Sequence, residues 1–68
     1  MNEETLNLSI RKFLKIVGIN SQREIERAVM RALDEGLIAG RESFPATVTL
    51  EIVGLNLNVK FDGEIRLE

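Results

Sequence analysis

Apolar and polar residues alternate strictly along two arms near the end of the chain, from Ala46 to Ile52 and from Leu55 to Phe61. A β-strand with one buried and one solvated face has this period of two. The alternation therefore predicts two strands, at about 46–53 and about 55–67. Gly54 lies between the arms and can provide the positive φ that a tight turn needs.

The connection between these strands has two candidate lengths. A two-residue connection, Val53-Gly54, would pair Ile52 with Leu55 and place Val48 opposite Val59. A four-residue loop, Val53 to Asn56, would shift the pairs and keep the same facing, because the shift is an even number of residues. The sequence thus predicts which residues share a face and leaves the loop length open.

Asp62-Gly63 is a strong turn signal within the second arm. A two-residue hairpin there would turn Ile65 and Leu67 away from the apolar face. A three-residue loop, Asp62 to Glu64, or a strand that continues through a bulge at Gly63 would keep them on it. We favour the continuing strand.

The amino-terminal half has the spacing of amphipathic helices, and the first is predicted at about 3–17. Asn2 can cap it, and Glu3 and Glu4 lie favourably at its positive end. Its apolar stripe consists of Leu6, Ile10, Phe13, Leu14 and Val17. Gly18 is suited to a left-handed stop. Leu8 lies on the outer face, either as a scattered surface leucine or as a contact with a partner.

A second helix is predicted at about 22–35. Ser21-Gln22-Arg23-Glu24 has the form of a capping box, and Gly36 can end the helix. The side chains that it would bury are Ile25, Ala28, Val29, Ala32 and Leu33. Leu37 to Phe44 then form a connector, and Pro45 favours an extended chain before it.

These elements predict an α+β fold in the order ααββ. Both helices would pack on one face of a small antiparallel sheet, within a single domain of residues 1–68, and the last strand could be broken in two. A chain of 68 residues forms a marginal core, and without cysteine it has no disulfide to reinforce it. A homodimer would add the burial that one copy lacks.

The composition argues against catalysis. Histidine, cysteine, tyrosine and tryptophan are all absent, which removes the usual general base, the thiol nucleophile and the commonest metal ligands. Asp62 and Glu64 flank Gly63, but a calcium loop needs more oxygen ligands at fixed spacing. No glycine-rich phosphate loop is present. We therefore expect no enzyme, no catalytic, cofactor-binding or metal-binding residue, and no cofactor.

Basic residues gather on the two predicted helices, although the net charge is −2. They are Arg11, Lys12, Lys15, Arg23, Arg27 and Arg31. The pair of helices has some likeness to a helix-turn-helix, but Leu14 is bulky where that motif needs a small residue, and no third helix follows. No aromatic residue is interleaved for base stacking. We prefer a solvated charged surface and keep nucleic-acid binding as the alternative.

Four stretches carry a resemblance to a known family. They are Ser9-Ile10-Arg11-Lys12-Phe13-Leu14-Lys15, Ser21-Gln22-Arg23-Glu24-Ile25-Glu26, Leu50-Glu51-Ile52 and Phe61-Asp62-Gly63-Glu64-Ile65. Together they resemble a family of short bacterial proteins of unknown function, over nearly the whole chain. The resemblance implies a free-standing cytosolic protein and brings no activity, ligand or site residue.

We therefore expect a small non-catalytic interaction module whose partner is another protein or a second copy of the chain. No apolar run approaches the length of a membrane span, and no signal peptide is evident, so we expect a cytoplasmic protein and no membrane partner.

Overall fold

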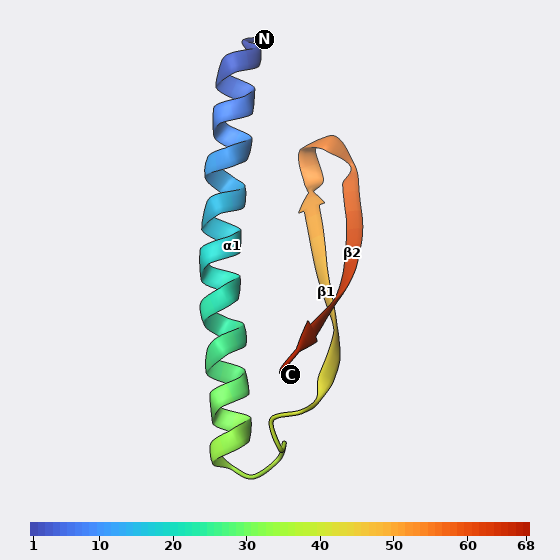
Figure 1. Ribbon diagram of the computed structural model, residues 1–68. Coiled ribbons are helices and arrows are strands. Elements are labelled where there is room, and N and C mark those ends of the chain that lie inside the picture. The colour runs from blue at the N-terminus through green and yellow to red at the C-terminus, as the bar shows by residue number, and fades with distance from the viewer. The chain divides into compact units, whose positions relative to one another are not determined.

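The computed structural model describes all 68 residues and has the order α1, β1, a short 3-10 turn and β2 (Figure 1). The chain divides into two compact units, Met1–Glu35 and Gly36–Glu68. The first unit is the helix α1, and the second contains the connector and the two strands.

One helix, α1, runs from Glu3 to Asp34. Its start is as predicted, because Asn2 Oδ1 accepts a hydrogen bond from the Thr5 backbone N–H at 3.1 Å. Its end is also as predicted, because Gly36 follows with φ of 71°, the left-handed conformation that favours glycine. No helix of the protein combines the length and the apolar character that crossing a bilayer requires.

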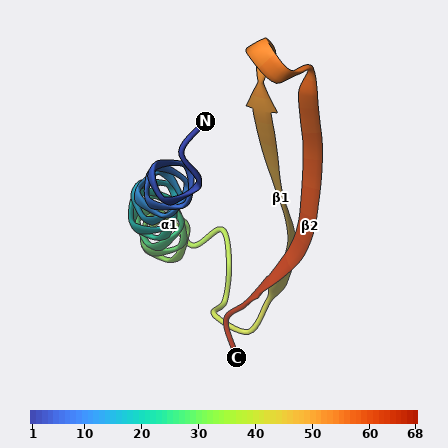
Figure 2. The same ribbon diagram turned by 90° about the horizontal axis from the view of Figure 1, so that it is seen from above.

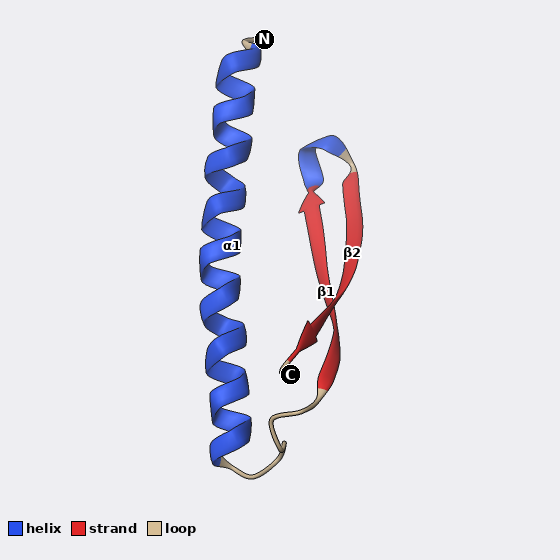
Figure 3. Ribbon diagram, in the orientation of Figure 1, coloured by secondary structure: helices blue, strands red, loops and turns tan.

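The prediction of two helices on a sheet is wrong, because α1 continues without a break through the residues expected to separate them (Figure 3). Gly18 lacks a positive φ, and Ser21 lies inside the helix instead of capping one. An interior glycine costs only about 1 kcal/mol relative to alanine. Breaking the helix would instead remove intrahelical partners from about four C=O groups at the new C-terminus and about four N–H groups at the new N-terminus. The continuous helix avoids that loss.

The second unit is an antiparallel hairpin of β1, Ser43–Ile52, and β2, Leu57–Arg66. Both strands differ slightly from the predicted 46–53 and 55–67, since β1 begins three residues earlier and includes Phe44 and Pro45. The strands twist about each other, as two-stranded ribbons do (Figure 1 and Figure 2). The register pairs Ile52 with Leu57 and continues without interruption to Ser43 and Arg66.

The loop between the strands has four residues, Val53 to Asn56, so the longer of the two candidate connections is confirmed. Val53–Leu55 form a 3-10 turn, and Asn56 closes it with φ of 51° and a hydrogen bond from its N–H to the Val53 carbonyl at 3.1 Å. Asparagine is one of the few residues besides glycine that visit this left-handed conformation readily. Asn56 thus has the role that the sequence suggested for Gly54.

Beyond Phe61 the strand continues, as favoured, but the predicted bulge at Gly63 is absent. Ala46 pairs with Gly63 and Pro45 with Glu64, with no extra residue on either strand. A bulge is unnecessary because Phe61, Ile65 and Leu67 are separated by even numbers of residues and already share one face.

The connector before β1 is organised by the side chain of Glu42. Its carboxylate accepts hydrogen bonds from the backbone N–H groups of Ala39, Gly40 and Arg41 at 2.8, 2.9 and 3.0 Å. These bonds, that from Ala39 first, favour the charged form and hold the pKa of Glu42 below its ordinary value, although desolvation opposes them. The Glu42 carbonyl also accepts from the Leu67 N–H at 3.0 Å, which extends the pairing of the hairpin.

Candidate association surfaces

One face of the hairpin is apolar along its whole length. Alternation puts five cross-strand pairs on it, which are Phe44–Ile65, Ala46–Gly63, Val48–Phe61, Leu50–Val59 and Ile52–Leu57. The sequence predicted this facing, and the register confirms it. Ala46, Leu50, Leu57 and Ile65 are partly covered, and the others remain exposed to solvent. The hairpin therefore presents a continuous apolar surface, which we call the apolar face.

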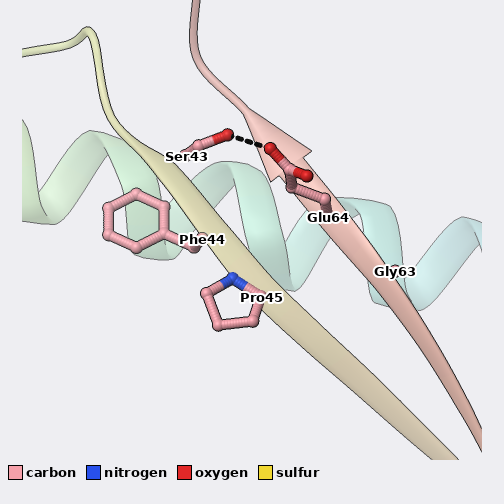
Figure 4. Close-up of a pocket in the computed structure, with 5 residues that line it drawn as sticks. All are labelled: Ser43, Phe44, Pro45, Gly63 and Glu64. Carbon is pink, nitrogen blue, oxygen red and sulfur yellow. Dashed lines mark hydrogen bonds between the residues drawn. The ribbon is translucent and has the colours of Figure 1, made fainter.

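The opposite face is polar and carries side-chain hydrogen bonds between the strands. Thr47 Oγ1 donates to Asp62 Oδ1 at 3.0 Å, and Asn58 Nδ2 donates to Glu51 Oε2 at 3.4 Å. Ser43 donates to the carboxylate of Glu64 diagonally across the strands (Figure 4). Such pairs stabilise a single register, and hence determine which residues lie on the apolar face.

Helix α1 has apolar residues on two sides. The first side extends the predicted stripe through the unbroken helix and lies within about 120° of arc. It contains Leu6, Ile10, Phe13, Leu14, Val17, Ile25, Ala28 and Ala32, and Ser21 and Glu24 interrupt it in the middle.

The second side lies opposite, within about 80° of arc. Its apolar residues are Leu8, Ile16, Ile19 and Met30, and the charged residues Lys12, Arg23 and Glu26 lie among them. All four apolar side chains are exposed. Of these apolar residues, sequence reasoning noticed only Leu8. The predicted helices at about 3–17 and 22–35 leave Ile19 between them, so they do not show the relation between Ile16, Ile19 and Met30 along one helix. The signal becomes visible once the helix is taken as continuous.

The six basic residues proposed for nucleic-acid binding all lie on α1 and do not share a face. They are Arg11, Lys12, Lys15, Arg23, Arg27 and Arg31, and they spread over about 200° of arc. Arg27 Nη1 lies 3.5 Å from Glu24 Oε1, in an ion pair whose side chains are 69% and 75% exposed. Such an exposed pair contributes little to stability. A solvated charged surface stays our prediction for these residues, and nucleic-acid binding stays the alternative to it.

A shallow open hollow of about 190 Å³ lies beside the start of β1 (Figure 4). It is lined by Ser43, Phe44, Pro45, Gly63 and Glu64. Sites for small organic ligands usually occupy about 300–1,000 Å³ and enclose most of the ligand. Nowhere do three or more acidic side chains gather in an arrangement that could hold a metal ion. The exposed apolar surfaces are thus the strongest candidates for a functional site.

Comparison with known proteins places the chain in a family. No curated protein and no solved structure matches it. A family described as "Family of unknown function (DUF6494)" matches residues 1–68, which is the whole chain. The resemblance to a family of unknown function is therefore confirmed, and the chain belongs to the DUF6494 family.

Proposed function

We propose that the protein is a non-catalytic interaction module that associates with a second copy of itself. The observation that carries this proposal is that neither of the two units, taken by itself, fully buries any side chain. All three phenylalanines, Phe13, Phe44 and Phe61, are among the exposed large hydrophobic residues. A small domain depends on burying most of its apolar surface, so these side chains need a further covering surface.

The two apolar sides of α1 support the proposal that another molecule provides this covering surface. The first side is centred near Leu6 and Ala28, and the second contains Ile16 and Ile19 on the opposite side of the helix. The hairpin offers a single apolar face, so contacts within one chain can cover at most one of these sides. At least one apolar side is left for a second molecule, whichever contacts the chain makes with itself.

A second copy is the simplest partner because it brings apolar surfaces of the same kind. Most soluble oligomers are homo-oligomers, and dimers are the commonest of these. The non-catalytic part of the proposal rests on the side-chain chemistry, since the chain has no histidine or cysteine. As part of the same proposal, we place the module in the bacterial cytoplasm, where a protein without disulfides is ordinary.

Sedimentation equilibrium across a range of concentrations tests the proposal. The chain has a mass of 7.7 kDa, and we expect a multiple of this mass at high micromolar concentration. Unfolding by urea should also shift to higher denaturant as the protein concentration rises, because association stabilises only the folded form. A mass of one chain throughout the range would refute self-association.

Two lysine substitutions on one strand form a matched pair for this test. Val48→Lys places a charge on the apolar face, and Thr49→Lys places the same charge on the polar face one residue later. A homodimer contains Val48 twice, so losing its burial at about 1.5 kcal/mol per copy should cost about 3 kcal/mol, which is roughly a hundredfold weaker association. Thr49→Lys should leave the association unchanged. Equal effects of the two changes would contradict burial of the apolar face.

A further inference from the structure

The hairpin is a sheet of two strands, and each strand therefore has one outer edge. In an antiparallel pair, residues alternate between those whose backbone groups bond to the other strand and those whose N–H and C=O point outward. The Leu67 N–H donates to the Glu42 carbonyl, so residues 42 and 67 form an inward-bonding pair. Every second pair along the register from this one also bonds inward, and these pairs are the residues of the apolar face. The residues of the polar face lie between them, so their backbone groups point outward.

The two edges differ in their capacity to accept another strand. On β1 the outward residues are Ser43, Pro45, Thr47, Thr49 and Glu51. Pro45 has no N–H, which removes one donor from that edge. On β2 the outward residues are Asn58, Lys60, Asp62, Glu64 and Arg66, and each has both a donor and an acceptor. The edge of β2 is therefore the complete one.

We propose that the outer edge of β2 pairs antiparallel with β2 of a second copy, across a two-fold axis at Phe61. This inference rests on the proposed self-association and specifies its geometry. The result is a four-stranded sheet in the order β1, β2, β2 of the partner and β1 of the partner. Exposed edges are the usual sites at which a further strand joins a sheet.

Charge selects this register among its neighbours. With the axis at Phe61, Lys60 lies opposite Asp62 of the partner, and this attraction occurs twice by symmetry. An axis at Asp62 would oppose the two Asp62 side chains, and an axis at Lys60 would oppose the two lysines. An axis at Gly63 would set Lys60 against Arg66 and Asp62 against Glu64. An axis at Val59 would set Lys60 against the neutral Asn58, with no attraction. Among the axes from Val59 to Gly63, only the one at Phe61 brings opposite charges together without opposing like charges.

The same register joins the apolar faces of the two hairpins. On that face Phe61 lies opposite Phe61 of the partner, Leu57 opposite Ile65, and Val59 opposite Gly63. Gly63 also becomes a diagonal neighbour of the partner's Phe61. No atom lies within 4 Å of the position where a Cβ would stand at Gly63, and its φ is not positive. The hairpin alone does not require glycine there, whereas two neighbouring phenylalanine rings benefit from the space.

Single cysteines test this geometry, because the natural chain has none. Directly opposite residues that do not bond through their backbones have Cα atoms about 4.5 Å apart, within the range that a disulfide spans. Phe61→Cys should therefore give a disulfide-linked dimer on mild oxidation. Val48→Cys is the matched control, on the same face and similarly exposed, at 50% against 57% for Phe61. Its two copies would be about 14 Å apart, which is three strand spacings and too far to link.

Charge exchange between chains is an independent test. Lys60→Asp and Asp62→Lys should each weaken association when alone, because each sets like charges opposite each other in the homodimer. An equimolar mixture of the two variants should associate again as a heterodimer, because every pair across the axis is then of opposite sign. Charge pairing within one chain could not produce this recovery.

The outcomes separate this inference from the proposed function. Suppose the protein dimerises, but cysteines at 61 link no faster than cysteines at 48 and the charge variants do not recover on mixing. The proposed pairing through the β2 edge would then be wrong, whereas self-association would stand. Faster linkage at 48 than at 61 would place the contact on β1, and would likewise contradict pairing through the edge of β2. A protein with the mass of one chain at all concentrations would overturn both.

Discussion

The continuity of α1 can be tested with a single methyl group at Gly18. In the structure Gly18 has an ordinary helical backbone, and nothing lies within 4 Å of the position where a Cβ would stand. Gly18→Ala should therefore stabilise the helix by about 1 kcal/mol, the difference between glycine and alanine in a helix interior. For a chain of this size, that corresponds to an increase in Tm of about 4–8 °C.

Gly36→Ala is the matched control, because it adds the same methyl group to the glycine after the helix. Gly36 has φ of 71°, a conformation that costs an L-residue roughly 1–2 kcal/mol. This substitution should lower the stability by about 1 kcal/mol. Identical chemistry at the two glycines should thus give effects of opposite sign.

Urea unfolding followed by far-UV circular dichroism measures both effects, at several protein concentrations so that a change in association is recognised. If α1 were two helices, Gly18 would occupy a left-handed stop like that at Gly36. Both substitutions would then destabilise the protein by similar amounts. A loss of stability in Gly18→Ala would therefore refute the continuous helix.

Three further predictions concern the helix start, the connector and the basic residues. Asn2→Ala should cost about 1 kcal/mol in urea unfolding, because the Thr5 N–H loses its cap, and an unchanged midpoint would contradict the capping role. The lowered pKa of Glu42 means that its ionised form adds stability above the unfolded-state pKa, and that this stability is lost as the pH falls through the folded-state pKa. An NMR titration should find that pKa below the ordinary value, and the stability advantage over Glu42→Gln should disappear in acid. Labelled DNA and RNA should not bind even at low salt, since the basic residues are spread around α1; binding that weakens steeply with salt would contradict this.

The hairpin was predictable because its signal is local and repeated. A period of two from Ala46 to Phe61 determines by itself which residues share a face of the hairpin. A polar residue at an apolar position of this pattern would have weakened that prediction. The loop length was not determined, since connections of two and four residues preserve the same facing. The choice depends on Asn56, whose left-handed conformation closes the longer loop and gives no distinctive signal in the sequence.

The helix was misjudged because two sound local signals lay next to each other. Gly18 is a frequent helix end, and Ser21 followed by Glu24 is a frequent helix start. Both signals describe what a residue can do at a helix end and do not establish that an end exists. On one continuous helix Val17, Ile25 and Ala28 lie within about 80° of arc, and this shared side was the better guide.

The role of Glu42 was missed for a different reason. Three backbone N–H groups converge on its carboxylate from a segment in which Gly40 adopts φ of 101°, a conformation that is not visible in the sequence. A glutamate between a connector and a strand reads as an ordinary surface residue. The candidate association surfaces were predictable where they follow from alternation, and unpredictable where they depend on the helix being continuous.

The strict alternation in β1 and β2 limits how the gene for this hairpin can change in length. Deleting one codon within β2 would rotate every following side chain by half a turn, so that the carboxylates of Asp62 and Glu64 would exchange places with the aromatic and aliphatic groups. Lengthening both arms by two codons would preserve the division. We therefore expect functional length variants of the strands to differ by even numbers of residues, and odd changes to be tolerated only between Val53 and Asn56.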